Sequence, residues 1–260
     1  MLFLFLNDTM EILGLDIGGS GIKGAIVETE NGRLVSERLR LATPKPALPG
    51  AVAKTVEELV RRLNWQGNIG CSFPMVVVDG KCKTAGNMMD DWVNVQVDEL
   101  FETACPNTKF HLGNDADLAG LAEMQLGVGN GLKGKVIMVT IGTGLGTGVF
   151  YNHILIPNIE MGRVLYENGE PIEFFASGLT RKKDNLELKE WAGRFDYFLT
   201  HLKRVMSPDH FIIGGGLSKK YKKFSSYLSV DVPLWVAHFE NDAGIIGAAL
   251  YAESQLNISD

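Results

Sequence analysis

Cysteine is scarce in this chain, which holds three such residues among 260. Cys71, Cys82 and Cys105 form no Cys-x-x-Cys pair, so the sequence predicts neither a disulfide framework nor a cysteine zinc site. The apolar opening at 1–6 lacks the basic start, the length and the small-residue cleavage site of a signal peptide. We therefore expect a protein of a reducing compartment, the cytoplasm.

Long apolar runs and excess positive charge are also lacking. No stretch approaches the roughly 20 apolar residues that would span a bilayer. The formal net charge of -6 argues against nucleic acid or an anionic membrane as the main partner. Because 45% of the residues are hydrophobic and the length of 260 exceeds the usual single domain, we expect two packed lobes that share a cleft.

Glycine, in contrast, is abundant and gathers in turns that recur. The first unit reads as a strand, a glycine turn and a second strand, at 12–17, 18–21 and 22–28. The same pattern returns at 136–150, where Gly142 takes the place of Gly18 and Thr140 that of Asp16. This internal repeat predicts one such hairpin in each lobe.

The spacing of apolar residues in the rest of the chain is typical of helices in some segments and of strands in others. Apolar spacing predicts helices at 52–63, 118–126, 185–205 and 243–251, with a basic helix from Ser218. It predicts strands at 33–41, 69–78, 108–112, 211–213 and 234–237, and loops at 83–92 and 173–178. This alternation is typical of an α/β protein.

Glycine turns between strands expose backbone N–H groups that can bind phosphate oxygens. Asp16 precedes the first turn and is a candidate to orient a water-bound Mg²⁺, and Ser20 and Lys23 follow as candidate phosphate contacts. A P-loop is excluded because Ile22, not glycine, precedes the lysine. A dinucleotide fingerprint is excluded because a strand pattern follows 142–146. Each turn taken alone is equally consistent with an ordinary hairpin.

Four segments resemble the ROK family of sugar kinases, namely 15–24, 114–117, 140–146 and 213–220. The similarity extends over about 11–252, and 157–160 and 190–194 are similar to the subgroup of polyphosphate glucokinases. The resemblance implies an α/β, actin-like ATPase (ribonuclease H-like) fold with two lobes around a central cleft. It implies a first lobe of residues 1–117 joined by the C-terminal helix 243–260, and a second lobe of residues 118–242. A homodimer is also implied.

The resemblance assigns roles residue by residue. Asp115 matches the catalytic base that takes the proton of the attacking sugar hydroxyl. The implied sugar contacts are Asn87, Asn114, Asp115, Glu160 and Glu173, with Arg163 beside them. The candidate phosphate or nucleotide contacts are Asp16, Gly18, Gly19, Ser20, Lys23, Thr140, Gly142, Thr143, Gly144, Gly214, Gly215, Gly216 and Lys219. The implied cofactors are Mg²⁺ at Asp16 and ATP or polyphosphate as phosphoryl donor.

Simpler interpretations exist for several of these residues. Asn114 and Asp115 also suit the cap of the following helix. Glu160 and Glu173 also suit a solvated surface, and Asn87 suits local loop packing. The glycines at 214–216 also suit a plain turn from strand to helix.

Two positions depart from the family pattern. The family has a histidine where this chain has Arg163, and a guanidinium cannot reproduce a neutral imidazole. The family's Pro-Gly is here Pro74–Met75, which adds a side chain near the expected sugar. The acceptor therefore stays open between glucose and another sugar. A sugar-binding protein without catalysis and an actin-like ATPase without a sugar substrate are the alternatives in other classes.

The basic residues gather in one part of the chain. Residues 181–223 hold eleven Lys or Arg against five Asp or Glu, although the whole chain is acidic. Next to a phosphate-binding glycine run, such a track suits a long polyanion such as polyphosphate. Solvated helix faces would have the same composition.

Overall fold

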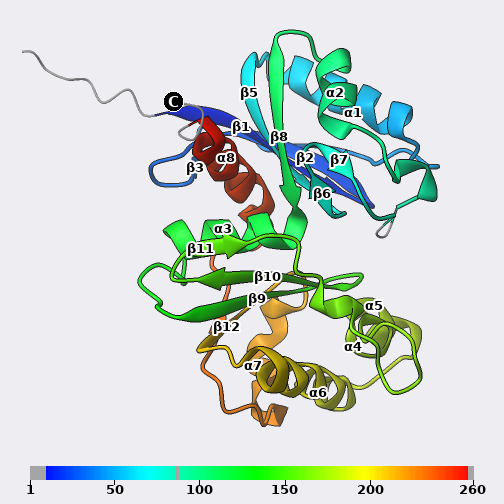
Figure 1. Ribbon diagram of the computed structural model, residues 1–260, viewed down its shortest axis with the longest axis vertical. Helices are drawn as coiled ribbons and strands as arrows, with labels where there is room; N and C mark the ends of the chain where they lie inside the picture. The colour runs from blue at the N-terminus through cyan, green and yellow to red at the C-terminus, as the bar shows by residue number, and fades with distance from the viewer. Residues whose placement is uncertain (1–9, 86–87, 257–260) are drawn as a thin grey trace, which may run out of the picture.

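The structure is a computed structural model, which describes residues 10–85 and 88–256. Two sheets form its two lobes, one above the other in Figure 1. The first sheet has the order β3-β2-β1-β5-β8, and β4 pairs with β2 outside this path. Its strands are β1 (Glu11–Gly18), β2 (Gly21–Glu28), β3 (Arg33–Leu34), β4 (Leu39–Leu41), β5 (Gly67–Phe73) and β8 (Thr108–Asn114).

The second sheet has the order β11-β10-β9-β12-β13. Its strands are β9 (Lys135–Ile141), β10 (Leu145–Tyr151), β11 (Ile154–Ile156), β12 (His210–Gly214) and β13 (Leu234–Val236). A short ribbon of β6 (Val77–Val78) and β7 (Lys81–Cys82) lies beside the first sheet. The expected α/β architecture with two lobes is therefore confirmed.

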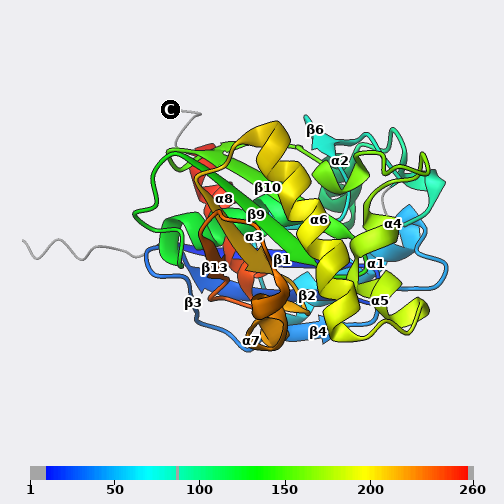
Figure 2. The ribbon, with the colours of Figure 1, turned by 90° about the horizontal axis from the view of Figure 1, so that it is seen from below.

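Helices fill three layers around the sheets (Figures 1 and 2). Helices α1 (Pro49–Arg62) and α2 (Val97–Ala104) pack on the outer face of the first sheet. Between the sheets lie α3 (Asp115–Leu126) and α8 (Ala243–Leu256). The second sheet's outer face carries α4 (Glu173–Ala176), α5 (Gly178–Lys183), α6 (Leu188–Met206) and α7 (Tyr221–Phe224). No helix in the described residues is long and apolar enough to cross a membrane.

Alternation along the strands explains this layering. In β9, Val136 and Met138 pack with the central helices, whereas Ile137 and Val139 pack with the outer ones. Successive side chains of a strand point to opposite faces, so a strand covered on both sides reads as a continuous apolar run. That is the pattern that the sequence shows at 136–141.

The central helix α8 approaches its neighbours backbone to backbone. A methyl group added at Gly70 would lie 1.8 Å from the carbonyl oxygen of Ala248, and one at Gly247 would lie 1.7 Å from that of Leu118. Neither position tolerates a side chain, because these distances are far shorter than a van der Waals contact. Glycine at these two points lets α8 join β5 to α3.

Several sequence expectations differ from the structure. The strand expected at 33–41 is divided into β3 and β4. The strand expected at 69–78 ends at Phe73, because Pro74 has no N–H for the ladder. The loop expected at 173–178 contains the helical turn α4. The basic helix expected from Ser218 is a 3₁₀ turn, Ser218–Lys220, followed by the short α7.

Candidate active site

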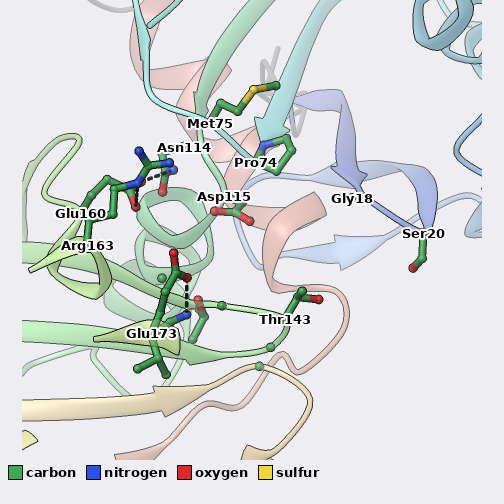
Figure 3. A pocket seen from close by; sticks show the side chains of 17 residues that line it. Gly18, Ser20, Pro74, Met75, Asn114, Asp115, Thr143, Glu160, Arg163 and Glu173 are labelled. Carbon is green, nitrogen blue, oxygen red and sulfur yellow. Dashed lines mark hydrogen bonds and ion pairs between the residues drawn. The ribbon is translucent and has the colours of Figure 1, made fainter. Parts of the chain in front are cut away.

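A cavity of about 530 Å³ lies between the two sheets. It is bounded by both glycine turns, by the start of α3 and by the segment that carries Glu160 and Glu173 (Figure 3). Of the predicted site residues, those that line it are Gly18, Gly19, Ser20, Asn114, Asp115, Thr140, Gly142, Thr143, Gly144, Glu160, Arg163, Glu173 and Gly215. The fold thus brings together residues that are up to about 200 positions apart in the sequence.

The junction between β8 and α3 positions Asp115. Asn114 caps α3, since its Oδ1 accepts from the backbone N–H groups of Ala116 at 2.9 Å and Asp117 at 3.3 Å. The Oδ1 of Asp115 accepts from the same Ala116 N–H at 2.8 Å. The helix cap suggested by the sequence is therefore present, and it orients Asp115 toward the cavity (Figure 3).

The environment of Asp115 makes it a candidate base. Its side chain opens into the cavity, but protein from both lobes surrounds it. Asp115 is exposed to the space of the cavity, but the surrounding protein atoms partly desolvate its carboxylate. This desolvation, together with the negative charges of Asp16 and Glu160, raises the pKa of Asp115 to about 7. A carboxylate with this pKa can take a proton near neutral pH and release it again.

Acidic side chains line the wall beside Asp115. Glu160 Oε1 accepts from Asn114 Nδ2 at 2.9 Å, and Glu173 Oε2 accepts from the backbone N–H of Leu145 at 3.2 Å. Burial raises the pKa of each carboxyl, while the positive charge of Arg163 opposes this rise in both. These acids therefore lie in a cavity, and the surface interpretation of them is wrong.

Arg163 lies beside Glu160, with 3.9 Å between its Nε and Glu160 Oε2. Both come from the segment that follows β11, and a 3₁₀ turn, Met161–Arg163, brings them to the same wall (Figure 3). The pair is loose, and the side chain of Arg163 is 42% exposed. A cation therefore stands next to the acids at the position of the family's histidine.

Met75 does not fill the cavity, contrary to the expectation from its place in the sequence. The residue borders the cavity, but it is 1% exposed and its Sδ lies 3.5 Å from the Sγ of Cys82 in the core of the first lobe. Figure 3 shows the side chain pointing away from Asp115. The side chain of Met75 is therefore packed in the core of the first lobe, next to Cys82.

The glycine turns face each other across the cavity. The first joins β1 to β2 at 18–21, and the second joins β9 to β10 at 142–144. In the second turn the N–H of Gly142 donates to the carbonyl of Gly144 at 3.1 Å. The two repeated hairpins predicted from the sequence are thus confirmed, and both turns line the same cavity.

A second cavity of about 160 Å³ adjoins the first at Asp115, Thr140 and Gly215. The strand register places Lys23, Asp16 and Ser72 side by side on β2, β1 and β5 along its wall. Lys23 Nζ is bonded to Asp16 Oδ2 at 2.6 Å, whereas the buried Oγ of Ser72 has no partner in the described part of the chain. Lys23 thus faces Asp16 in this cavity and does not line the larger one.

Asp16 fits the expected magnesium role in one respect. Mg²⁺ is usually held by one or two carboxylates together with substrate phosphates and waters, not by an all-protein cage. Asp16 and Asp115 both line the second cavity, next to an unpaired hydroxyl. No cluster of three or more His, Cys, Asp or Glu side chains able to hold a metal occurs within 10–85 and 88–256.

A further cavity of about 370 Å³ borders the outer side of the second glycine turn. Lys182 and Lys220 lie on its wall, together with Gly142, Thr143 and Gly216. Lys219 is instead paired with Glu240, 2.7 Å away. The basic track of the sequence is therefore divided, and Lys182 and Lys220 line a cavity together with residues of the second glycine turn.

Not every predicted residue is found in these cavities, and three residues that matter were not singled out. Gly214 ends β12 and lines none of these cavities, and Asn87 lies outside the described residues. Sequence reasoning missed Ser72, whose place depends on strand register. Asp117 and Asn158 fall within the segments 114–117 and 157–160, but no role was predicted for them. Asp117 is 2% exposed and accepts from the N–H of Asn158 at 2.7 Å.

Comparisons with known proteins agree with this geometry. Residues 12–160 match the model of the ROK family. The polyphosphate glucokinase of Mycobacterium tuberculosis (strain CDC 1551 / Oshkosh) is 39% identical over 237 residues, which cover 91% of this chain and 89% of that protein. The crystal structure of the inorganic polyphosphate/ATP-glucomannokinase from Arthrobacter sp. strain KM is 36% identical. It covers 94% of this chain and 99% of that one, with a TM-score of 0.90.

A more distant structure extends the comparison of the fold. The ROK family glucokinase from Streptomyces griseus, in complex with glucose and AMPPNP, is 22% identical and has a TM-score of 0.81. The alignment covers 94% of this chain and 100% of that one. The actin-like fold expected from the resemblance is thereby confirmed.

Proposed function

The chain belongs to the ROK family, and we propose that it is a sugar kinase that transfers a phosphoryl group from polyphosphate or ATP to a hexose, with glucose as the first candidate acceptor. The observation that carries this proposal is the position of Asp115. Its carboxylate stands between the acidic wall and the two glycine turns, in one cavity. The names of the relatives from M. tuberculosis and Arthrobacter support both the donors and the acceptor.

In the proposed reaction, Asp115 accepts the proton of the sugar hydroxyl as the hydroxyl oxygen attacks the terminal phosphorus of the donor. The bond from this phosphorus to the bridging oxygen breaks, and the shortened donor leaves with that electron pair. The N–H of Ala116 holds one oxygen of Asp115, so the carboxylate keeps its orientation. For glucose the product is glucose 6-phosphate.

The acidic wall would bind the acceptor. Asn114 and Glu160 hold each other at 2.9 Å, and each keeps further capacity for hydrogen bonds with sugar hydroxyls. Glu173 reaches the same cavity from α4. Buried carboxylates form strong, directional bonds with hydroxyl donors, which suits the selection of one hydroxyl for attack.

The glycine turns would bind the donor. Their backbone N–H groups and the hydroxyls of Ser20 and Thr143 border the same cavity as Asp115. Mg²⁺, held through Asp16 and the donor phosphates, would neutralise the charge that develops on the transferred group. Lobe closure would bring the two turns together, with residues 1–117 and 243–260 in one lobe and residues 118–242 in the other.

Lys182 and Lys220 support a long polyanionic donor. They border the cavity outside the second glycine turn, where a chain of phosphates would emerge from the site. A positive surface at this point attracts each further phosphate of polyphosphate, whereas ATP has three. We therefore propose that polyphosphate is a working donor besides ATP.

The proposal includes a cytoplasmic homodimer. The three cysteines are free thiols, which suits a reducing compartment. Ile154 and Ile156 on the edge strand β11 are 71% and 42% exposed, and such apolar edges suit contact with a second copy. Light scattering after gel filtration would give the oligomeric state directly.

A kinase for a different sugar is the second candidate, and Arg163 favours it. A guanidinium beside Glu160 either neutralises that carboxylate or binds an acidic substituent on the acceptor. A sugar-binding protein that does not catalyse is the third. The complete set of Asp115 and both phosphate turns favours the kinases over it.

A grid of acceptors against donors tests the proposal. Neutral hexoses, hexosamines and hexuronic acids would each be incubated with ATP or polyphosphate and Mg²⁺, and the sugar phosphate formed would be measured. We expect turnover with at least one neutral hexose and with both donors. Turnover confined to acidic sugars would favour the second candidate, and tight sugar binding without any product would favour the third.

A further inference from the structure

The loop 157–160, which carries Glu160, is held at two points by the start of α3. The backbone N–H of Asn158 donates to Asp117 Oδ2 at 2.7 Å, and Asn114 Nδ2 donates to Glu160 Oε1 at 2.9 Å. Asn114 and Asp117 stand on either side of Asp115 in the sequence. The acceptor loop and the candidate base therefore share one support.

Asn158 also connects this loop to the first lobe. Its side-chain Nδ2 donates to the carbonyl of Val77 at 3.1 Å. Val77 begins β6, two residues after Met75, which borders the larger cavity with Pro74. The backbone of Asn158 has φ of 62°, a left-handed conformation that asparagine adopts more readily than most residues. One residue thus presents its N–H to α3 and its side chain to β6.

The junction has more acceptors than donors. Asp117 is 2% exposed, and its Oδ1 and the Oδ1 of Asn158 are both buried without a partner in the described residues. Buried oxygens without a hydrogen-bond partner destabilise a fold. A contribution to stability therefore does not explain why Asp117 and Asn158 are present here. Burial raises the pKa of Asp117 to about 7, so at neutral pH part of the protein carries a proton here that supplies a donor.

We propose that Asp117 and Asn158 are positioning residues, which set the place of Glu160 relative to Asp115 and tie the acceptor loop to the first lobe. The inference rests on the proposed function, because it assigns the acceptor to Glu160. Neither side chain lines the larger cavity, so both would act through the loop and not on the sugar itself.

The first test is Asp117→Ala, measured as KM and binding constant for the sugar and KM for the donor. The alanine leaves the N–H of Asn158 without its acceptor, and an unpaired donor of this kind costs enough that we expect a roughly 5- to 100-fold rise in both constants for the sugar. The donor KM should stay within about twofold. Asp117→Asn should restore sugar affinity, because its amide oxygen still accepts from Asn158. Gln125→Ala, on an exposed position of the same helix, is the matched control.

The second test is Asn158→Gly, which separates the two contacts. Glycine adopts the same positive φ and keeps the N–H to Asp117, but it removes the bond to Val77. A single neutral hydrogen bond predicts a roughly 2- to 12-fold rise in the sugar KM, smaller than that of Asp117→Ala.

Amide hydrogen exchange gives a readout that does not need turnover. Exchange at Asn158 should accelerate in Asp117→Ala, and stay unchanged in Gln125→Ala. An unchanged sugar affinity in Asp117→Ala, or an equal rise for sugar and donor, would overturn the positioning role. A wild-type protein that phosphorylates no sugar would overturn the proposed function instead, while sugar binding and exchange would still decide the role of Asp117.

Discussion

Asp115→Asn is the substitution that bears most directly on the proposed chemistry. The asparagine keeps the size of the side chain, and its amide oxygen can still accept from the N–H of Ala116. It removes the ability to accept a proton. A positioned base contributes about 10²- to 10⁴-fold, so we expect phosphotransfer to fall by at least roughly 100-fold while sugar affinity stays within a few fold.

The dependence of wild-type kcat/KM on pH tests the same role of Asp115 as a base. The pKa of Asp115 is raised to about 7, and the unprotonated form is the active base. Activity is therefore gained as the pH rises through about 7. About a tenth of a group with this pKa is unprotonated at pH 6 and about nine tenths at pH 8, so kcat/KM should rise roughly tenfold between them.

Asp115→Asn should lower activity but raise the stability of the fold above neutral pH. Because the folded pKa lies above the ordinary value, the protonated form favours folding at low pH, and this contribution is lost as the pH rises through about 7. Asp115→Asn should therefore raise Tm at pH 8 more than at pH 5. A coupled assay for sugar phosphate and a thermal melt give both measurements. A flat kcat/KM between pH 6 and 8, or near wild-type turnover in the variant, would refute the assignment.

Three further predictions concern the walls of the site. Met75→Ala should lower the free energy of unfolding by about 2–5 kcal/mol, because it leaves a cavity in the core. The KM for the sugar should stay nearly unchanged. A lower KM with little loss of stability would instead place the side chain in the sugar site. Exchanging both Lys182 and Lys220 for Ala removes two exposed charges, each worth about 0.2–1 kcal/mol. The KM for long polyphosphate should therefore rise roughly 2- to 30-fold, and added salt should raise the KM of the wild type in the same way. The same exchange at Lys222 and Lys223 is the control, and an equal effect there would assign both pairs to a general surface charge. Arg163→His should raise kcat/KM for glucose by removing the cation beside Glu160, whereas a loss of glucose turnover would make Arg163 a working part of a glucose site.

Local patterns were sufficient to predict the frame of the site. The strands around both glycine turns and the cap at Asn114 follow from apolar runs, glycine placement and the Asn-Asp pair at the head of α3. These signals act over a few residues, which is the range that periodicity and capping describe. The repeat then predicted one such hairpin in each lobe.

Contacts between distant segments were beyond such patterns. The sequence predicts the side chain of Met75 near the sugar. In the structure this side chain points into the core of the first lobe, because it packs there beside Cys82. The ion pair of Lys23 with Asp16 depends on the register of β1 and β2, which no local pattern gives. The hydrogen bond that the N–H of Asn158 donates to Asp117 spans 41 positions and has no local signature.

The balance between sugar phosphate formed and donor consumed tests the central claim most directly. Purified wild-type protein would be given ATP or polyphosphate with and without glucose, and both quantities would be followed in the same sample. The account predicts one sugar phosphate for each phosphoryl group lost from the donor, negligible donor loss without sugar, and loss of both signals in Asp115→Asn. Donor consumption at the same rate with and without any sugar, with no sugar phosphate formed, would contradict it.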